Sequence, residues 1–364
     1  MVVHLLQQRQ CKGNLIMTTK HFTANVISAT KVVPDGNFGN SAASGVWDLS
    51  EQYDLRKGGN WPETGNSNPA DLGLYLGTSN SGNPNFYGDS IRSYSFSSLG
   101  SSSDFGDSLS EKFVLTSALA STTRAVFGGG STKNPNSSFS DVMQYVTILT
   151  AGNSTDFGNL TVGRQGTGAH SNSTRGIFGS GQSSGGRSNV MDYITIANTG
   201  NATDFGDLSS ILSIAGGTGS STRAIFAGGL ASSSQTAEMQ YVTIASTGNA
   251  TNFGSLSASR QGIGGCSSAT RAVFAGGTHS SNGNYNTIEY VTIDTTGDST
   301  DFGDLTSSQA GAAAGTSNGT IGVYLYSTFE NSITIASTGN GTAFTDSSVA
   351  HDTATTSGGH GGLQ

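Results

Sequence analysis

The chain has 364 residues, a formal net charge of −8 and only 16 Lys plus Arg, so it carries no basic stripe and nucleic acid is not an expected partner. Charged residues make up 11% of the chain, whereas 53 glycines and many Ser, Thr and Asn residues separate recurring aromatic and β-branched residues. This composition excludes a disordered tail and favours an all-β fold.

Residues 1–16 hold apolar residues interrupted by Gln, Arg, Cys and Lys, and no run reaches the roughly eighteen apolar residues of a membrane helix. We therefore expect neither a transmembrane span nor a signal peptide. Because Met17 begins a more ordinary polar start, we interpret residues 1–16 as a disordered extension or a start-site artefact. The two cysteines, Cys11 and Cys266, are too few for a disulfide framework or a cysteine-based metal site.

The stretch 41–62 contains both tryptophans, Trp47 and Trp61, and its Pro- and Gly-bounded ends predict a short helix. Its order of Gly-Val-Trp, then Glu-Gln, then Trp-Pro is similar to segments of virion structural and tail-fibre-like proteins of tailed bacteriophages, particularly marine ones. The resemblance covers only this part of the chain. It implies that residues 17–66 are a virion-docking segment, with Trp47, Tyr53 and Trp61 as its apolar anchors.

Short phrases recur six times from residue 71 onwards. The first is Thr-Arg, two small or β-branched residues and an aromatic residue, at 123–127, 174–178, 222–226 and 270–274, with weaker copies at 71–75 and 320–324. The second is Tyr-Val-Thr-Ile or an equivalent about 18 residues later, and its alternation predicts a strand. The third is Asp-Phe-Gly-Asp or an equivalent after a Thr-Gly-Asn-type turn, and a less regular stretch such as 260–266 completes each unit.

A unit of about fifty residues with four short antiparallel strands has the size of one propeller blade. We predict a propeller domain at 67–364 with blades near 71–118, 119–170, 171–218, 219–266, 267–316 and 317–358. The recurring Phe and Val or Ile would form the core between blades, and Gly-Gly would let strands approach closely near the axis. Because no seventh unit follows, we expect the C-terminal stretch 347–358 to complete the first blade beside 71–77 and so close the ring.

A strand ending in Gly-Gly, a spaced aromatic pair and a polar stretch ending in Arg together resemble a kelch repeat. In one unit these places are taken by residues 226–229, Tyr241, Phe253 and Arg260. Phe replaces the usual Trp, and the intervening turn is longer. The resemblance spans 71–358 and implies an all-β, six-bladed kelch-like β-propeller with four antiparallel strands per blade.

The sequence does not single out an enzyme site. A kinase metal site uses one Asp-Phe-Gly phrase with a phosphate loop, a lysine and a catalytic loop, whereas this chain repeats the phrase and lacks the other parts. A galactose-oxidase-like copper site would need a thiol-modified tyrosine, for which Cys266 is the only candidate in the propeller. Nothing pairs the carboxylates that a glycosidase needs, since four glutamates fall at different offsets: Glu111, Glu238, Glu289 and Glu330. We therefore predict a non-enzymatic protein with no catalytic, cofactor-binding or metal-binding residue.

The arginines of the first phrase leave two interpretations open. They could form a ring that binds an acidic ligand at the mouth of the channel, or each could pair with a turn carboxylate such as Asp156 or Asp204. We favour the second, because each arginine belongs to the scaffold phrase itself. The residues concerned are Arg124, Arg175, Arg223 and Arg271.

Four loops differ most between units, at 131–140, 181–189, 230–237 and 279–287. A repeat scaffold keeps its framework and diversifies one face, so these loops are the expected binding surface. Their Ser, Asn and Gly content suits weak polar contacts to a glycan that many copies engage together, and suits solvent-facing loops equally well. The candidate ligand-binding residues are Asn136, Ser183, Ser233, Asn282 and Tyr285.

These features predict a bacteriophage virion structural protein, made in the host cytoplasm and carried in multiple copies on the particle surface. The N-terminal segment would contact other virion proteins, and the propeller would face outward to bind a host-surface glycan, as in a tail fibre or tail-associated protein. The alternatives are a capsid decoration protein and a carbohydrate-active propeller enzyme. We expect no cofactor, no nucleic-acid partner and no insertion into a membrane.

Overall fold

The computed structural model describes residues 5–11, 14–20, 69–76, 89–109, 115–132, 138–213, 215–232, 234–308, 314–325, 330–344 and 354–363. The chain forms two compact units, Met1–Ser67 and Asn68–Gln364. The anchors expected for virion docking, Trp47, Tyr53 and Trp61, lie outside the described residues.

In the first unit, β1 (Leu5–Cys11) and β2 (Asn14–Lys20) pair as an antiparallel hairpin, with Cys11 opposite Asn14. Only Lys12 and Gly13 separate the two strands, a spacing that is typical of a tight hairpin. The described part of 1–16 therefore has regular secondary structure, which differs from the disordered extension that we expected from its sequence.

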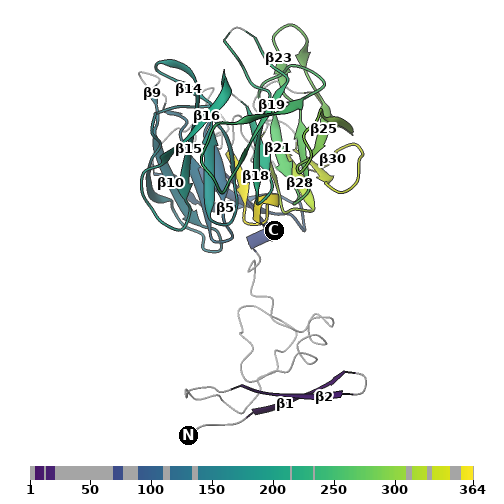
Figure 1. The fold of residues 1–364 in the computed structure, drawn as a ribbon. Helices are drawn as coiled ribbons and strands as arrows, with labels where there is room; N and C mark the ends of the chain where they lie inside the picture. Colours follow the sequence, from purple (N-terminus) through teal and green to yellow (C-terminus); the bar gives the residue numbers. More distant parts are fainter. Residues whose placement is uncertain are drawn as a thin grey trace. The chain divides into compact units, whose positions relative to one another are not determined.

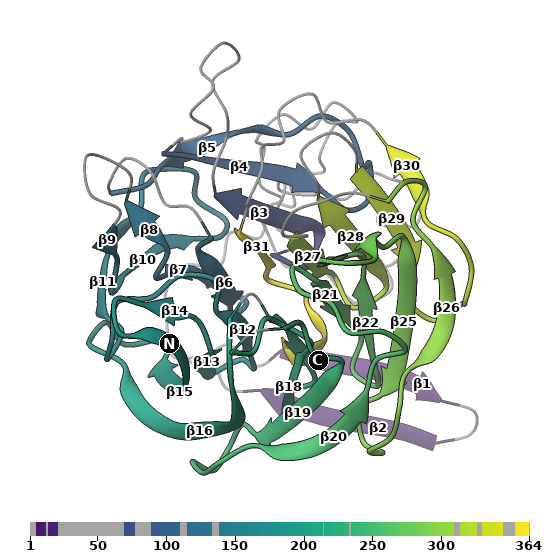
Figure 2. The same ribbon diagram turned by 90° about the horizontal axis from the view of Figure 1, so that it is seen from above.

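The second unit is a six-bladed β-propeller, in which six four-stranded antiparallel sheets surround a central axis (Figures 1 and 2). Strands are given below from the innermost to the outermost. The first blade consists of β31 (Ala354–Ser357), β3 (Leu72–Leu76), β4 (Ser90–Ser95) and β5 (Ser103–Asp107). The second consists of β6 (Ser117–Ala120), β7 (Arg124–Gly128), β10 (Val142–Thr147) and β11 (Thr155–Asn159). The third consists of β12 (Gly168–Ser171), β13 (Arg175–Gly179), β15 (Gly186–Thr195) and β16 (Thr203–Leu212).

The other three blades repeat this order. The fourth consists of β17 (Gly216–Gly219), β18 (Arg223–Ala227), β19 (Glu238–Thr243) and β20 (Thr251–Ser255). The fifth consists of β21 (Gly264–Ser267), β22 (Arg271–Ala275), β25 (Thr287–Thr292) and β26 (Thr300–Asp304). The sixth consists of β27 (Ala314–Ser317), β28 (Ile321–Leu325), β29 (Glu330–Thr334) and β30 (Thr342–Phe344).

Short additional elements extend this plan. They are the hairpin strands β8 (Ser131–Thr132) and β9 (Ser138–Phe139), β14 (Gln182–Ser183), the hairpin strands β23 (Thr278–His279) and β24 (Gly283–Asn284), and the 3-10 helices η1 (Pro69–Asp71) and η2 (Gly361–Leu363).

The blades are displaced by one strand from the sequence repeats. The fourth phrase of each repeat forms the innermost strand of the following blade; residues 264–267, for example, pair with β22 and not with β20. The blade boundaries expected from the repeats, such as 219–266, are therefore wrong by this one strand. The reason is that the sequence period fixes the length of a unit but does not say at which phrase the sheet begins.

The ring closes through its C-terminal strand, as we predicted. β31 pairs with β3 over four residue pairs, from Gly73 opposite Ser357 to Leu76 opposite Ala354, and Figure 2 shows β31 in yellow beside β3. Because β31 comes from the other end of the described chain, the first blade is completed by residues about three hundred positions away in sequence.

The hydrophobic core lies between the blades, as the repeats predict. Each join between two blades holds one cluster of buried side chains, such as Phe274, Val291 and Ile293 of the fifth blade packed against Ile225 and Phe253 of the fourth. The second strand of a blade is buried on both faces, and in β22 only the first residue, Arg271, is partly exposed. Burial on both faces explains why the apolar residues of this strand are continuous and do not alternate with polar residues.

The glycine of the Asp-Phe-Gly phrase is required by a contact between blades. At Gly158 the outer strand bulges and φ is +136°, a backbone region that favours glycine. A Cβ at this position would overlap the carbonyl oxygen of Gly200 in the next blade. There the backbone nitrogen of Gly200 donates to the carbonyl of Phe157 at 2.6 Å, so the phrase joins two blades.

The two ends of the propeller differ. One end, which we call the turn face, carries the turns between the first and second and between the third and fourth strands of each blade, such as 121–123 and 148–154. The other end, the loop face, carries the connections between the second and third strands and the connections from blade to blade. The chain both enters and leaves the propeller at the turn face, where Pro69 of η1 lies against Gly358 (Figure 1).

Candidate functional site

The loop face carries those candidate ligand-binding residues that the structure describes. Ser183 lies in β14 of the third blade, where its hydroxyl donates to the carbonyl of Gly186 at 3.0 Å. Asn282 and Tyr285 lie together in the fifth blade, and the Asn282 amide donates to the Tyr285 hydroxyl at 3.3 Å. Asn136 and Ser233 lie outside the described residues. The structure thus brings Asn282 and Tyr285 together in one loop and places Ser183 two blades away.

The repeated arginines have a different role from the two that we considered. In each of the second to fifth blades, the guanidinium donates to a backbone carbonyl of the following blade, as Arg271 does to Ile335 at 2.8 Å. The same guanidinium lies over a tyrosine ring of its own blade, and the Arg271 Cζ is 4.3 Å from the Tyr290 centroid. We call this arrangement the arginine bridge. It occurs at Arg124, Arg175, Arg223 and Arg271.

Carboxylate pairing of these arginines is therefore wrong, and so is a ring around the mouth of the channel. The tyrosine under each guanidinium meets a buried phenylalanine edge-on, with 6.1 Å between the rings of Tyr290 and Phe302. A planar guanidinium on an aromatic face gains a cation–π attraction and still reaches a carbonyl at the edge of the ring. The sequence does not indicate which carbonyl accepts from each arginine, because every residue of the next blade has a backbone carbonyl.

The innermost strands surround a narrow channel along the axis. The second residue of each of these strands is small, namely Ala118, Ala169, Gly217, Gly265, Gly315 and Thr355. Neighbouring innermost strands are in contact around the whole ring, so larger side chains would not fit. A Cβ at Gly217, for example, would collide with the backbone of Ala169. Close approach at the axis thus comes from the fourth phrase and not from the Gly-Gly of the first phrase, where we had placed it.

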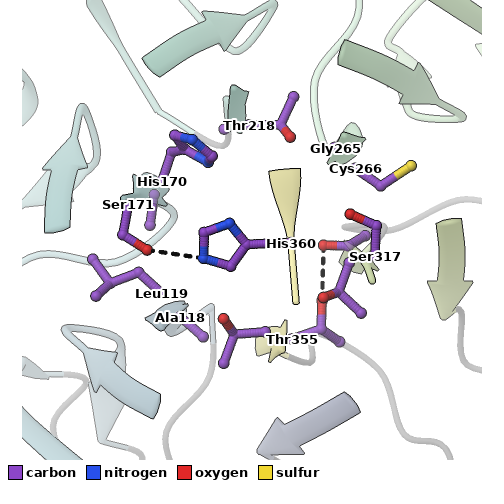
Figure 3. A pocket seen from close by; sticks show the side chains of 15 residues that line it. Ala118, Leu119, His170, Ser171, Thr218, Gly265, Cys266, Ser317, Thr355 and His360 are labelled. Carbon is purple, nitrogen blue, oxygen red and sulfur yellow. Dashed lines mark hydrogen bonds between the residues drawn. The ribbon is translucent and has the colours of Figure 1, made fainter. Parts of the chain in front are cut away.

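His360 fills the channel at the turn face. Figure 3 shows its imidazole in the middle of the ring of innermost-strand residues, pointing toward Ser171. Its Nε2 lies 3.0 Å from the carbonyl oxygen of Ala120 and 3.1 Å from the Ser171 hydroxyl, and its Nδ1 accepts from the backbone nitrogen of Gly362 at 3.1 Å. The ring of His170 lies 5.3 Å away, and its Nε2 is 3.0 Å from the carbonyl of Ser220. The cavity left beside the two rings measures about 30 Å³.

Both histidines are neutral in the folded protein. Burial, and to a smaller extent the nearby His360, lower the pKa of His170 to about 3. Burial likewise lowers the pKa of His360 to about 4. Two neutral imidazoles whose nitrogens contact backbone groups hold the C-terminal turn in place and offer no proton near neutral pH.

Cys266 lines the same cavity but does not have the character of a reactive thiol. Burial raises the pKa of the Cys266 thiol to about 12, and its sulfur lies 3.2 Å from the Tyr324 hydroxyl. The sulfur of Cys266 thus contacts the oxygen of the Tyr324 side chain. A thiolate, the form that attacks electrophiles and binds metals, is disfavoured at such a site.

Three acidic side chains of the propeller join neighbouring blades. Asp192 accepts from the Arg164 guanidinium at 2.8 Å and from the Thr161 hydroxyl at 2.6 Å, and Glu289 pairs with Arg260. Glu238 accepts from two serine hydroxyls of the third blade. No Asp or Glu is among the residues that line the two described cavities on the axis. Within the described part of the chain, no group of three or more His, Cys, Asp or Glu side chains is placed to hold a metal ion.

Two features of the interior were not expected from the sequence. The pairing of His170 with His360 was missed, because 189 residues separate His360 from its neighbour Ser171 and nothing in the repeats marks it. The ion pairs Arg164–Asp192 and Arg260–Glu289 could have been predicted from the sequence. Each repeat that ends in one of these arginines is followed by a repeat in which an acidic residue comes directly before the tyrosine of the second phrase.

No protein-family model matches the chain, and no curated protein is detectably similar to it in sequence. The fold itself, a six-bladed β-propeller, is therefore established by the structure alone. Among the described residues, no helix has the length and apolar character needed to cross a membrane.

Proposed function

We propose that this protein is a non-enzymatic structural component of a tailed-bacteriophage virion, carried in multiple copies, whose kelch-like propeller presents its loop face to the host surface. The observation that carries the proposal is a difference between the two faces of the propeller. The chain enters and leaves at the turn face, whereas the loops that differ between blades gather at the loop face. The resemblance of residues 41–62 to virion segments supports the particle as its location.

The non-enzymatic part of the proposal is supported by the contacts that the polar groups inside the propeller make. Asp192, Glu238 and Glu289 each accept hydrogen bonds across a join between blades, and the two axial histidines contact backbone groups. A glycosidase needs two carboxylates that flank a sugar bond in an accessible cleft. The described cavities on the axis are lined by small residues, hydroxyls, two imidazoles and one thiol.

Mass spectrometry of purified particles tests the location. The chain is expected in the particles, and its absence from them would overturn the virion assignment. Deletion of residues 17–66 is expected to leave a folded propeller that no longer enters particles, because this segment would make the contact with other virion proteins. Normal incorporation of the deletion variant would contradict the docking role.

Binding of the full-length protein to host cells separates adhesion from capsid decoration. An adhesive protein is expected to bind the host surface through the loop face, and replacement of both Asn282 and Tyr285 by alanine should weaken this binding several-fold. A protein that is found on particles but does not bind the host surface would be assigned to capsid decoration.

A further inference from the structure

A groove of about 360 Å³ opens at the turn face of the sixth blade. Its lining comes mainly from β28, β29 and the turn that follows them, with Leu99 contributed by the first blade and Phe302 by the fifth. A volume of this size lies within the roughly 300–1,000 Å³ of small-molecule sites.

No arginine bridge crosses the join between the sixth and first blades, and the groove extends into the space that a bridge would take. Val323 lies opposite Ser332 as Val273 lies opposite Tyr290, so Ser332 occupies the position of the tyrosine. Ile321 likewise occupies the position of Arg271. The side chains that fill the corresponding space in the second to fifth blades are thus replaced by two smaller ones.

A second contact is also altered at this join. In the turns of the second to sixth blades, an Asn or Asp side chain accepts from a backbone nitrogen of the preceding blade, as Asn340 does from Asp304 at 3.0 Å. The corresponding turn position of the first blade is Ser101, whose side chain is shorter. The sixth and first blades are therefore joined by fewer of the recurring polar contacts, and the smallest of the six buried clusters lies here.

The chemistry of the lining selects the class of ligand. Leu99 and Ile321 supply an apolar surface on the side of the first blade, and Phe302 and Ile333 supply one on the side of the fifth. Hydroxyl and amide groups lie beside it at Ser332, Asn340 and Thr342. None of the lining residues is ionisable. A charged ligand would lose hydration at such a site without gaining a counter-charge, whereas a neutral ring with one apolar face and several hydroxyls matches both parts of the lining.

We propose that this groove is a binding site for a neutral pyranose of a surface glycan. The inference rests on the proposed adhesive function and places one sugar contact at the turn face, at the opposite end of the propeller from the loop face. The aliphatic side chains would contact the apolar face of the sugar ring. Ser332 and Thr342 would exchange hydrogen bonds with its hydroxyls, and Asn340, whose Oδ1 already accepts from Asp304, would donate through its amide nitrogen.

The neighbouring blades show which side chains would fill the groove. The double substitution Ile321→Arg and Ser332→Tyr would build the arginine bridge of the neighbouring blades, so it is expected to occupy the groove while keeping or raising the thermal stability. The matched control is Thr300→Val, which changes the residue at the position of Thr342 in the fifth blade and leaves the groove intact.

The experiment is a calorimetric titration, together with saturation-transfer NMR, of the full-length protein with methyl glycosides of glucose, galactose, mannose and N-acetylglucosamine, and with the charged methyl glucuronide. We expect at least one neutral glycoside to bind with a Kd of about millimolar, and the glucuronide to bind at least about tenfold more weakly. The groove-filling variant should lose about tenfold or more in affinity, and the Thr300→Val control should keep the affinity of the unchanged protein.

Binding that survives in the groove-filling variant, equal losses in that variant and in the Thr300→Val control, or no binding of any neutral glycoside would each overturn the inference. If the double variant does not fold, the single substitution Thr342→Val tests the site instead. It removes one hydroxyl at an exposed position and is expected to weaken binding about threefold. Unchanged affinity in Thr342→Val would contradict the site. The virion role is judged separately, by the presence of the chain in purified particles, so either proposal can fail while the other stands.

Discussion

At the scale of single residues, polar side chains in this propeller mostly connect one blade to the next. Arg271 is typical, since its guanidinium lies on Tyr290 in its own blade and donates to a carbonyl in the sixth. Arginine suits this place because its planar head can stack on a ring and donate at its edge, which the ammonium of a lysine does less well.

Removal of one arginine bridge should therefore weaken the propeller measurably. Arg271→Leu is expected to lower the free energy of unfolding by about 1–3 kcal/mol, because it loses one cation–π contact and one hydrogen bond to a carbonyl. Arg271→Lys, which keeps the charge but not the planar head, should recover only part of this loss. Urea denaturation measures both, and equal midpoints for Arg271→Leu and the unchanged protein would contradict the role of the bridge.

The axial histidines make stability depend on pH. The folded-state pKa values of about 3 for His170 and about 4 for His360 lie below the ordinary value of 6.5, so the unfolded chain binds more protons. Stability from these groups is therefore present above about pH 6.5 and is lost as the pH falls towards the folded-state values. The expected loss is about 2 kcal/mol for each histidine between pH 7 and about pH 5.

Urea midpoints at these two pH values measure the effect. His360→Gln keeps a side-chain donor that can reach the Ala120 carbonyl and removes the titrating group, so its midpoint should change less between the two pH values. An equal pH dependence in His360→Gln and in the unchanged protein would show that this buried imidazole does not carry the effect.

At the scale of strands, the repeats vary in a coordinated way. The residue before the second-phrase tyrosine accepts a backbone hydrogen bond from the preceding blade whether it is an acid, as at Glu289, or an amide, as at Gln240. Where it is an acid, the preceding repeat supplies a buried arginine, Arg260 in this case. Where it is Gln240, the corresponding residue of the preceding repeat is the buried Leu212.

Leu212 and Gln240 thus show which neutral residues could replace the buried ion pair of Arg260 and Glu289. Glu289→Gln alone should cost about 3–5 kcal/mol, because it leaves the guanidinium of Arg260 buried beside a neutral amide. Adding Arg260→Leu rebuilds the arrangement of Leu212 and Gln240, so the double variant should recover most of the lost stability. A double-mutant cycle in urea measures the coupling, and additive losses would contradict the proposed exchange.

At the scale of the whole molecule, the ring depends on a single strand from the C-terminus. β31 is the innermost strand of the first blade, and it lies between β27 of the sixth blade and β6 of the second. Without it the first blade would lose its contact with the axis, and the join between the sixth and first blades, already the one with the smallest core, would open. The turn that follows β31 adds a separate contact through His360.

Two truncations separate the strand from the turn. A chain that ends at residue 353 should lose about 4 kcal/mol or more, because the backbone pairing over four residue pairs of β31 with β3 is lost at about 1 kcal/mol per hydrogen bond. A chain that ends at Gly359 keeps β31 and removes residues 360–364, which include His360 and η2, so it should retain a single cooperative transition at a lower urea midpoint. Identical melting of the 353 truncation and the full chain would refute closure by β31.

Much of the propeller could be predicted from particular residues. The six aromatic ends of the first phrase fixed the number of blades, the alternation of Tyr-Val-Thr-Ile predicted a strand, and the missing seventh unit predicted closure by the C-terminus. The loop-face residues Asn282 and Tyr285 could be placed in one loop because they are neighbours in the chain. The acceptors of the arginines could not be predicted, since backbone carbonyls carry no sequence signal.

The sequence by itself determined that the chain repeats a four-stranded unit six times and that such units must bury their apolar faces against one another. Only the tertiary structure decided where a blade begins, which groups the arginines reach, and that His360 lies in the channel beside His170. The physical reason is that a periodic pattern records which residues are buried in every unit. A contact between units joins residues about thirty to more than two hundred positions apart, and it depends on how the blades pack in the ring.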